Sequence, residues 1–154
     1  MRRLLIAFGS ACLMAAAVSA EPATGRVMKV LSHYLDLKGR HTLSPSLYQR
    51  DVYQAQLRQH PEQRSALRFD VQWKAKGADT AQLRLRVELR GVVKGGLPQK
   101  LVLEQPVKRG KWFSTWSALT LSGSEYKAFG ELTSWRVTLW DGERLLGEQK
   151  SFLW

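Results

Sequence analysis

Apolar and polar residues alternate with a period of two along much of the chain. The clearest run is Leu83 to Arg90, in which four aliphatic residues fall on one face and three arginines and a glutamate on the other. A helix would scatter Leu83, Leu85, Val87 and Leu89 around its circumference, so this run predicts a β-strand.

Weaker runs of the same kind predict further strands. Residues 27–37 form a first candidate with imperfect alternation, ended by Gly39. The run 69–74 shows the pattern of a half-buried antiparallel strand. The run 100–107 contains Pro106, which places it at a sheet edge or a strand end because proline cannot donate to a ladder.

One segment has helical rather than strand spacing. Ser44 and Pro45 form a helix start, because serine caps free N–H groups and proline is tolerated at the first position. Apolar residues then recur at helical spacing, at Tyr48, Val52 and Ala55, and Pro61 stops the run. We expect a helix over about 45–59. Its narrow apolar stripe suits a position on the edge or end of a sheet.

The C-terminal part predicts a short helical turn and then a hairpin. Residues 123–129 form the turn, closed by Gly130. The hairpin spans 135–146, with Asp-Gly at its turn because this pair tolerates positive φ. Trp135, Val137 and Leu139 should share the core face, while Arg136 and Trp140 share the opposite face and are placed for a cation–π contact.

The register of that hairpin has two alternatives. A two-residue turn places Leu139 opposite Arg144, and a four-residue turn places it opposite Leu146. The second suits burial better and is favoured.

Six or seven strands with one N-terminal helix and a helical turn predict an immunoglobulin- or fibronectin-III-like antiparallel β-sandwich, forming a single domain over 21–154.

The first twenty residues have the features of a secretory signal peptide. Arg2 and Arg3 precede an apolar stretch that is too short for a membrane anchor, and small residues lead to expected cleavage after Ala20. The only cysteine, Cys12, leaves with this segment. We therefore expect an exported protein, periplasmic or extracellular, with no transmembrane segment and no disulfide after cleavage.

The net charge is strongly positive. Loss of Arg2 and Arg3 lowers Lys plus Arg from 24 to 22 against 13 acidic residues, so the net charge falls from +11 to +9. Outside the cytoplasm such a protein meets envelope proteins or anionic polymers and lipids, and no nucleic acid is expected as a partner. A solvated sheet face accounts for the same charge without any ligand.

Two groups of basic residues are candidate binding surfaces. Lys108, Arg109 and Lys111 precede Trp112, and cations beside aromatic rings suit anionic polymers. The other group lies on the polar face of the 83–90 run and consists of Arg84, Arg86 and Arg90. The competing interpretation of 116–121 is a core strand with a buried Trp116.

Catalytic chemistry has little support. The three histidines, His33, His41 and His60, lack further ligands at metal spacing, and we expect them to be exposed or to cap helices. The acidic residues are scattered, so no carboxylate pair can be nominated. We expect no catalytic, cofactor-binding or metal-ligating residue.

The expected function is that of a noncatalytic binding or scaffolding module in the cell envelope. The alternative is a module that binds anionic polysaccharide or lipid.

Three runs carry a resemblance to small exported bacterial proteins: LDLKGRHTLSPSLYQRD, QHPEQRSALRFDVQW and FGELTSWRVTLWDGERLLGEQKSFLW. The resemblance covers nearly all of 21–154. It implies the same domain limits and an Ig-like β-sandwich, and it carries over no activity, cofactor or catalytic residue.

Overall fold

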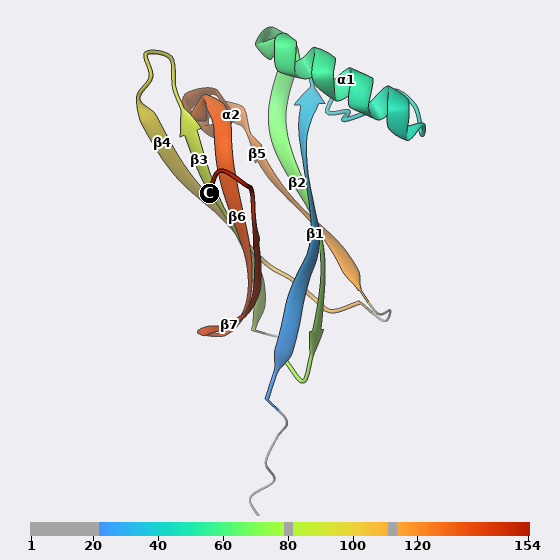
Figure 1. The fold of residues 1–154 in the computed structure, drawn as a ribbon, viewed down its shortest axis with the longest axis vertical. Coiled ribbons are helices and arrows are strands. Elements are labelled where there is room, and N and C mark those ends of the chain that lie inside the picture. Colours follow the sequence, from blue (N-terminus) through green and yellow to red (C-terminus); the bar gives the residue numbers. More distant parts are fainter. Residues whose placement is uncertain (1–21, 79–81, 111–113) are drawn as a thin grey trace, which may run out of the picture.

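The computed structural model describes residues 22–78, 82–110 and 114–154, which form two antiparallel sheets packed face to face (Figure 1). The three-stranded sheet has the order β1 (Thr24–Asp36), β2 (Arg64–Lys76), β5 (Thr115–Ser122). The four-stranded sheet has the order β4 (Pro98–Pro106), β3 (Leu83–Val92), β6 (Glu131–Asp141), β7 (Arg144–Lys150). Two helices, α1 (Leu47–Gln59) and α2 (Gly123–Phe129), and a short 3₁₀ turn (Pro61–Gln63) complete the described elements. The predicted mainly β sandwich with two short helices is confirmed.

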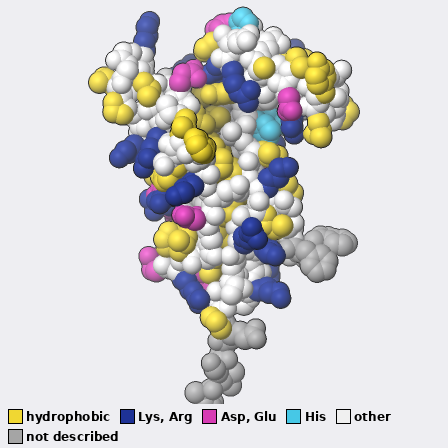
Figure 2. Space-filling view, viewed as in Figure 1, with side chains coloured by type: hydrophobic (Ala, Val, Ile, Leu, Met, Phe, Trp, Pro, Cys, Tyr) yellow, Lys and Arg dark blue, Asp and Glu magenta, His cyan; other side chains and the backbone are white. Residues whose placement is uncertain are grey.

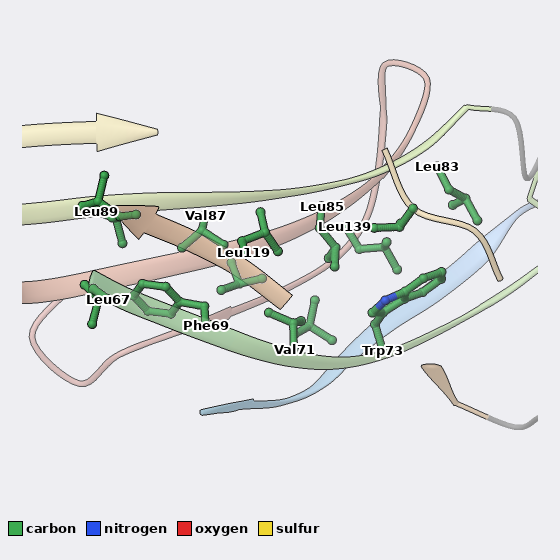
Figure 3. Close-up of a cluster of buried hydrophobic side chains, with 14 of the residues drawn as sticks. Leu67, Phe69, Val71, Trp73, Leu83, Leu85, Val87, Leu89, Leu119 and Leu139 are labelled. Atoms are coloured by element: carbon green, nitrogen blue, oxygen red, sulfur yellow. The ribbon is translucent and has the colours of Figure 1, made fainter. Parts of the chain in front are cut away.

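The core lies between β2 and β3, whose inward side chains face one another (Figure 3). Phe69, Val71 and Trp73 of β2 are fully buried, as are Leu85 and Val87 of β3. Burial of each such side chain contributes about 1.5–3 kcal/mol, which supplies most of the driving force for packing the two sheets. The sequence predicted this inward face of β3 because strand alternation leaves no other arrangement.

A glycine lies between the end of α2 and the start of β6 for a steric reason. Gly130 has φ +79° and ψ −147°, a conformation that residues with a side chain rarely adopt. A Cβ placed there would lie 2.3 Å from the backbone oxygen of Val92. The predicted helical turn over 123–129 and its closure by Gly130 are confirmed. The backbone of Val92 lies so close to Gly130 that it leaves no room for a side chain.

The C-terminal hairpin adopts neither of the two registers considered. Asp141 pairs with Arg144 and Trp140 with Leu145, so the turn itself has two residues. A register shift then places Leu139 opposite Gly147. Leu139 is fully buried. The predicted partner Arg144 is wrong because Gly142 and Glu143, rather than Asp141 and Gly142, form the turn. The predicted partner Leu146 is wrong because the bulge shifts the register by one residue.

Helix α1 differs from its prediction at its start and in its orientation. It begins at Leu47, and the N-cap residue is Ser46, whose side chain makes no capping hydrogen bond. The predicted stripe at Tyr48, Val52 and Ala55 is exposed, whereas Gln54 and Leu57 are buried. Hydrophobic side chains consequently gather on the outside of α1 toward its N-terminal end (Figure 2). The expected position at the end of a sheet is confirmed, since α1 lies across one end of β1 and β2 (Figure 1).

The two sheets meet along one side through β1 and β7, where glycines allow a close approach. A Cβ on Gly147 would lie 3.0 Å from the Cα of Arg26 and 3.1 Å from the oxygen of Gly25. On the other side β4 and β5 are neighbours. As predicted, β4 is an edge strand, and prolines at both of its ends limit pairing with another chain.

Candidate functional site

Two of the three arginines on the predicted basic face of β3, Arg84 and Arg86, have acidic neighbours. Arg84 lies 3.6 Å from Glu104 on β4 and 3.5 Å from Glu143 in the hairpin turn. Arg86 lies 3.4 Å from Glu88 on the same strand face. For Arg84 and Arg86 these ion pairs agree with the interpretation of a solvated sheet face, because both cations have local acidic partners.

The aromatic contacts of this face differ from the prediction. The guanidinium of Arg90 lies 3.9 Å from the ring centre of Trp154, and that of Arg136 lies 5.1 Å from the same ring. Trp140 instead contacts Arg84, at 5.9 Å, so the predicted Arg136–Trp140 pair is wrong. Adjacent strands decide the contact: β3 lies beside β6 and places Arg84 directly opposite Trp140.

The second basic group is described only in part. Lys108 and Arg109 are exposed, while Lys111 and Trp112 lie outside the described residues. Lys108 and Arg109 follow the end of β4, where Pro106 pairs with Arg84 of β3. Arg90 lies about 20 Å further along β3. The two groups are therefore not gathered at one point.

Trp116 is 49% exposed, on the outer side of β5, so the expectation that it is buried is wrong. The inward positions of β5 are occupied by Leu119 and Leu121. Strand alternation determines this result, because Trp116 lies an odd number of residues from both leucines.

His33 is buried rather than exposed. It is only 6% accessible, its ring centre lies 5.0 Å from that of His41, and its Nε2 lies 3.7 Å from the Asp70 carboxylate. Burial, with a smaller contribution from His41, lowers the pKa of His33 to about 4, although Asp70 acts in the opposite direction. The ring is therefore neutral at pH 7. Among the described residues no group of three or more His, Cys, Asp or Glu side chains could hold a metal ion.

Asp36 organises the turn that follows β1. Its carboxylate accepts hydrogen bonds from the backbone N–H groups of Lys38 and Arg40, both at 2.8 Å, and from the Tyr53 hydroxyl at 2.7 Å. Burial alone would raise the pKa of Asp36, but these bonds and the Arg40 side chain outweigh it and hold the pKa well below its ordinary value. The Asp36 carboxylate thereby links the turn after β1 to α1 through Tyr53.

Two further side chains, both missed by the sequence analysis, hold α1 in place. The amide of Gln54 bonds the backbone N–H and C=O of Tyr34, each at 2.9 Å. The guanidinium of Arg64 donates to the backbone oxygens of Leu57 and Arg58 at the end of α1. Gln54 is a polar residue within a helix and Arg64 is a charged residue at the start of β2. Residues of both types are usually exposed, so the sequence carries no signal for either role.

The bonds from Gln54 reveal which backbone groups of β1 face outward. Tyr34 directs both of its backbone groups away from β2, so its pairing with Leu67 is of the non-hydrogen-bonded kind. Such pairs alternate along an antiparallel ladder, and no shift occurs between Lys29 and Leu35. The backbone groups of Val30 and Ser32 consequently also point away from β2, toward the outer edge of the sheet.

A hollow of about 280 Å³ lies at this outer edge, beneath α1. Four consecutive residues of β1, from Val30 to His33, line one side of it. The helix supplies the other side through Arg50, Asp51, Gln54 and Arg58. The hollow therefore joins an open strand edge to charged side chains, and it is the candidate binding site of the described part of the chain.

The fold and this site define the protein as a two-sheet antiparallel β-sandwich with an open strand edge. A comparison of the chain with protein-family models, with curated proteins and with solved structures finds no match in any of the three. None of the helices described has the length and apolar character needed to cross a membrane.

Proposed function

We propose that the protein is an exported, noncatalytic β-sandwich that binds another component of the cell envelope through an exposed strand edge. The observation that carries this proposal is the outward direction of the backbone groups of Val30 and Ser32, beside a hollow. Unpaired strand edges add strands from partner chains, because main-chain hydrogen bonds form with any extended segment. Export is proposed from the signal-like residues 1–20.

Two of the other edges, those of β4 and β7, fit this role less well. Prolines at the two ends of β4 remove donors there, and β7 faces β1 at close range through Gly147. On the basic face of β3, Arg84 and Arg86 are engaged in ion pairs with Glu88, Glu104 and Glu143. These contacts make a strand edge the better candidate than the alternative of a basic surface for anionic polysaccharide or lipid.

The test is affinity capture from an envelope extract at low and high salt, with a variant that blocks the edge. Ser32→Pro removes the outward N–H and retains the ladder to β2, since proline is tolerated where a strand faces solvent. Ala118→Pro is the matched control, because the same alternation places the N–H of Ala118 on the opposite edge of the sheet, away from β2.

The proposal expects capture of one protein at both salt concentrations, lost in the Ser32→Pro variant and retained in the Ala118→Pro variant. Capture of polymer or lipid that disappears at high salt, and on replacing Lys108 and Arg109 by alanine, would support the alternative instead. Thermal unfolding of each variant shows whether the fold is intact. Capture that is indifferent to Ser32→Pro in a folded protein contradicts the strand-edge proposal.

A further inference from the structure

The open edge of β1 is short and blocked at both ends. At one end the Gln54 amide occupies the position of a neighbouring strand opposite Tyr34. At the other end Gly147 of β7 lies against residues 25–27. The free stretch is therefore 28–33, about 20 Å long, which accepts roughly six residues of an extended chain.

The charges that flank this stretch have an excess of cations. Arg58 lines the hollow from α1, and Lys29 lies on β1 beside it; both are exposed, and neither has an ion pair among the described residues. Arg50 also lines the hollow but is engaged at 2.9 Å by Asp51, the one acidic residue of the lining. His33 contributes no charge at pH 7.

We infer that the stretch 28–33 of β1 binds an extended acidic peptide segment of a partner protein, whose backbone pairs with Val30 and Ser32 and whose carboxylate meets Arg58. This inference rests on the proposed function and names the chemistry of its partner. Backbone pairing provides binding without selecting a sequence. Arg58, which has no ion pair among the described residues, selects for a carboxylate because an arginine–carboxylate contact forms a charge-assisted hydrogen bond.

The acidic preference distinguishes this site from the charged face of β3. There Arg84 and Arg86 already lie beside glutamates, so an acidic partner would have to displace existing pairs. At the β1 edge Arg58 has its charge available and lies in the same hollow as the open backbone groups. Backbone recognition and charge recognition therefore occur within one site.

The experiment uses three fluorescent peptides and the full protein. Each peptide has six residues of alternating valine and threonine between Gly-Ser flanks, and one central threonine is replaced by glutamate, glutamine or lysine. Fluorescence anisotropy measures affinity, and amide NMR shifts report where the peptide binds. The glutamate peptide should bind best, with shifts concentrated at 28–33.

The variants separate the backbone contribution from the charge contribution. Ser32→Pro should weaken binding of every peptide by about tenfold or more, and Ala118→Pro should leave it unchanged. Arg58→Gln should reduce affinity for the glutamate peptide by roughly threefold to tenfold and leave the glutamine peptide unaffected. Arg109→Gln removes an exposed cation that follows β4 and is the control for loss of charge alone.

Equal affinity for the glutamate and lysine peptides, shifts centred on β5 or on the β3 face, or no binding of any peptide would overturn the inference. The proposed function has a separate readout, the dependence of envelope capture on Ser32→Pro. Capture that needs the edge while acidic peptides show no preference would refute the acidic partner and leave the strand-edge function standing.

Discussion

The side-chain amide of Gln54 bonds both backbone groups of Tyr34, each at 2.9 Å, as a neighbouring strand would. The same amide nitrogen donates to the backbone oxygen of His41 at 2.8 Å. One buried side chain thus joins α1, the end of β1 and the intervening loop. It also sets the limit of the open edge, because pairing by another chain cannot extend past Tyr34.

Replacing Gln54 by alanine should lower the free energy of unfolding by about 2–3 kcal/mol, because backbone groups of Tyr34 and His41 lose their partners. Urea denaturation measures the change, and hydrogen exchange at the Tyr34 amide should accelerate. Gln56→Ala is the control: its exposed side-chain amide bonds the Gln63 side chain at 3.3 Å and no backbone group of the described residues. Equal stability of the two variants would show that the Gln54 bonds contribute little.

Gly130→Ala should destabilise the protein by about 3–5 kcal/mol, because it combines an unfavourable φ with a clash against the backbone oxygen of Val92. Thermal or urea unfolding measures the loss. Gly96→Ala has a similar φ, +81°, but open space around its Cβ, and should cost about 1 kcal/mol. Similar costs at the two sites would mean that the contact with Val92 relaxes easily.

His33 should make the protein less stable in mild acid. Its pKa is about 4 in the folded protein and 6.5 for a histidine free of these surroundings, as in the unfolded chain, so the unfolded chain binds more protons between these values. Stability is retained above pH 6.5 and decreases as the pH falls toward 4. The His33 contribution to this loss is about 2 kcal/mol between pH 7.5 and pH 5.

Urea denaturation across this pH range provides the measurement, and His33→Gln should flatten the dependence. The neighbouring groups are His41, whose pKa is also lowered, Asp70, Arg50 and Arg68. His60→Gln is the control because His60 is exposed. An unchanged pH dependence in His33→Gln would assign the acid sensitivity to other groups.

Arg64→Lys should cost about 2 kcal/mol, because an ammonium cannot reach the carbonyls of Leu57 and Arg58 and the Glu131 carboxylate together. Glu131→Gln should cost less than about 1 kcal/mol, since Glu131 is 58% exposed and its pairing is partly replaced by water. Chemical denaturation of both variants shows whether the carbonyls or the ion pair dominate. A larger loss for Glu131→Gln would reverse this assignment.

The elements that the sequence predicted correctly are those whose pattern leaves a single arrangement. Strand β3 could bury only Leu83, Leu85, Val87 and Leu89, and Gly130 could only end a helix. The candidate site was not predictable in this way. It depends on Gln54, a polar helix residue whose burial follows from where α1 lies, and on the free edge of β1, which exists only once strand order is known.

The sequence by itself determined that the described part of the chain is a mainly β sandwich with two short helices, because period-two alternation and the turn residues act locally. Tertiary structure alone decided the hairpin bulge, the exposed face of α1, the burial of His33 and the pairing of the β3 arginines with acidic neighbours. Each of these depends on contacts between residues far apart in the chain. The hydrophobic pattern along one helix or strand determines which of its faces is apolar. Tertiary packing alone decides which residues that face contacts.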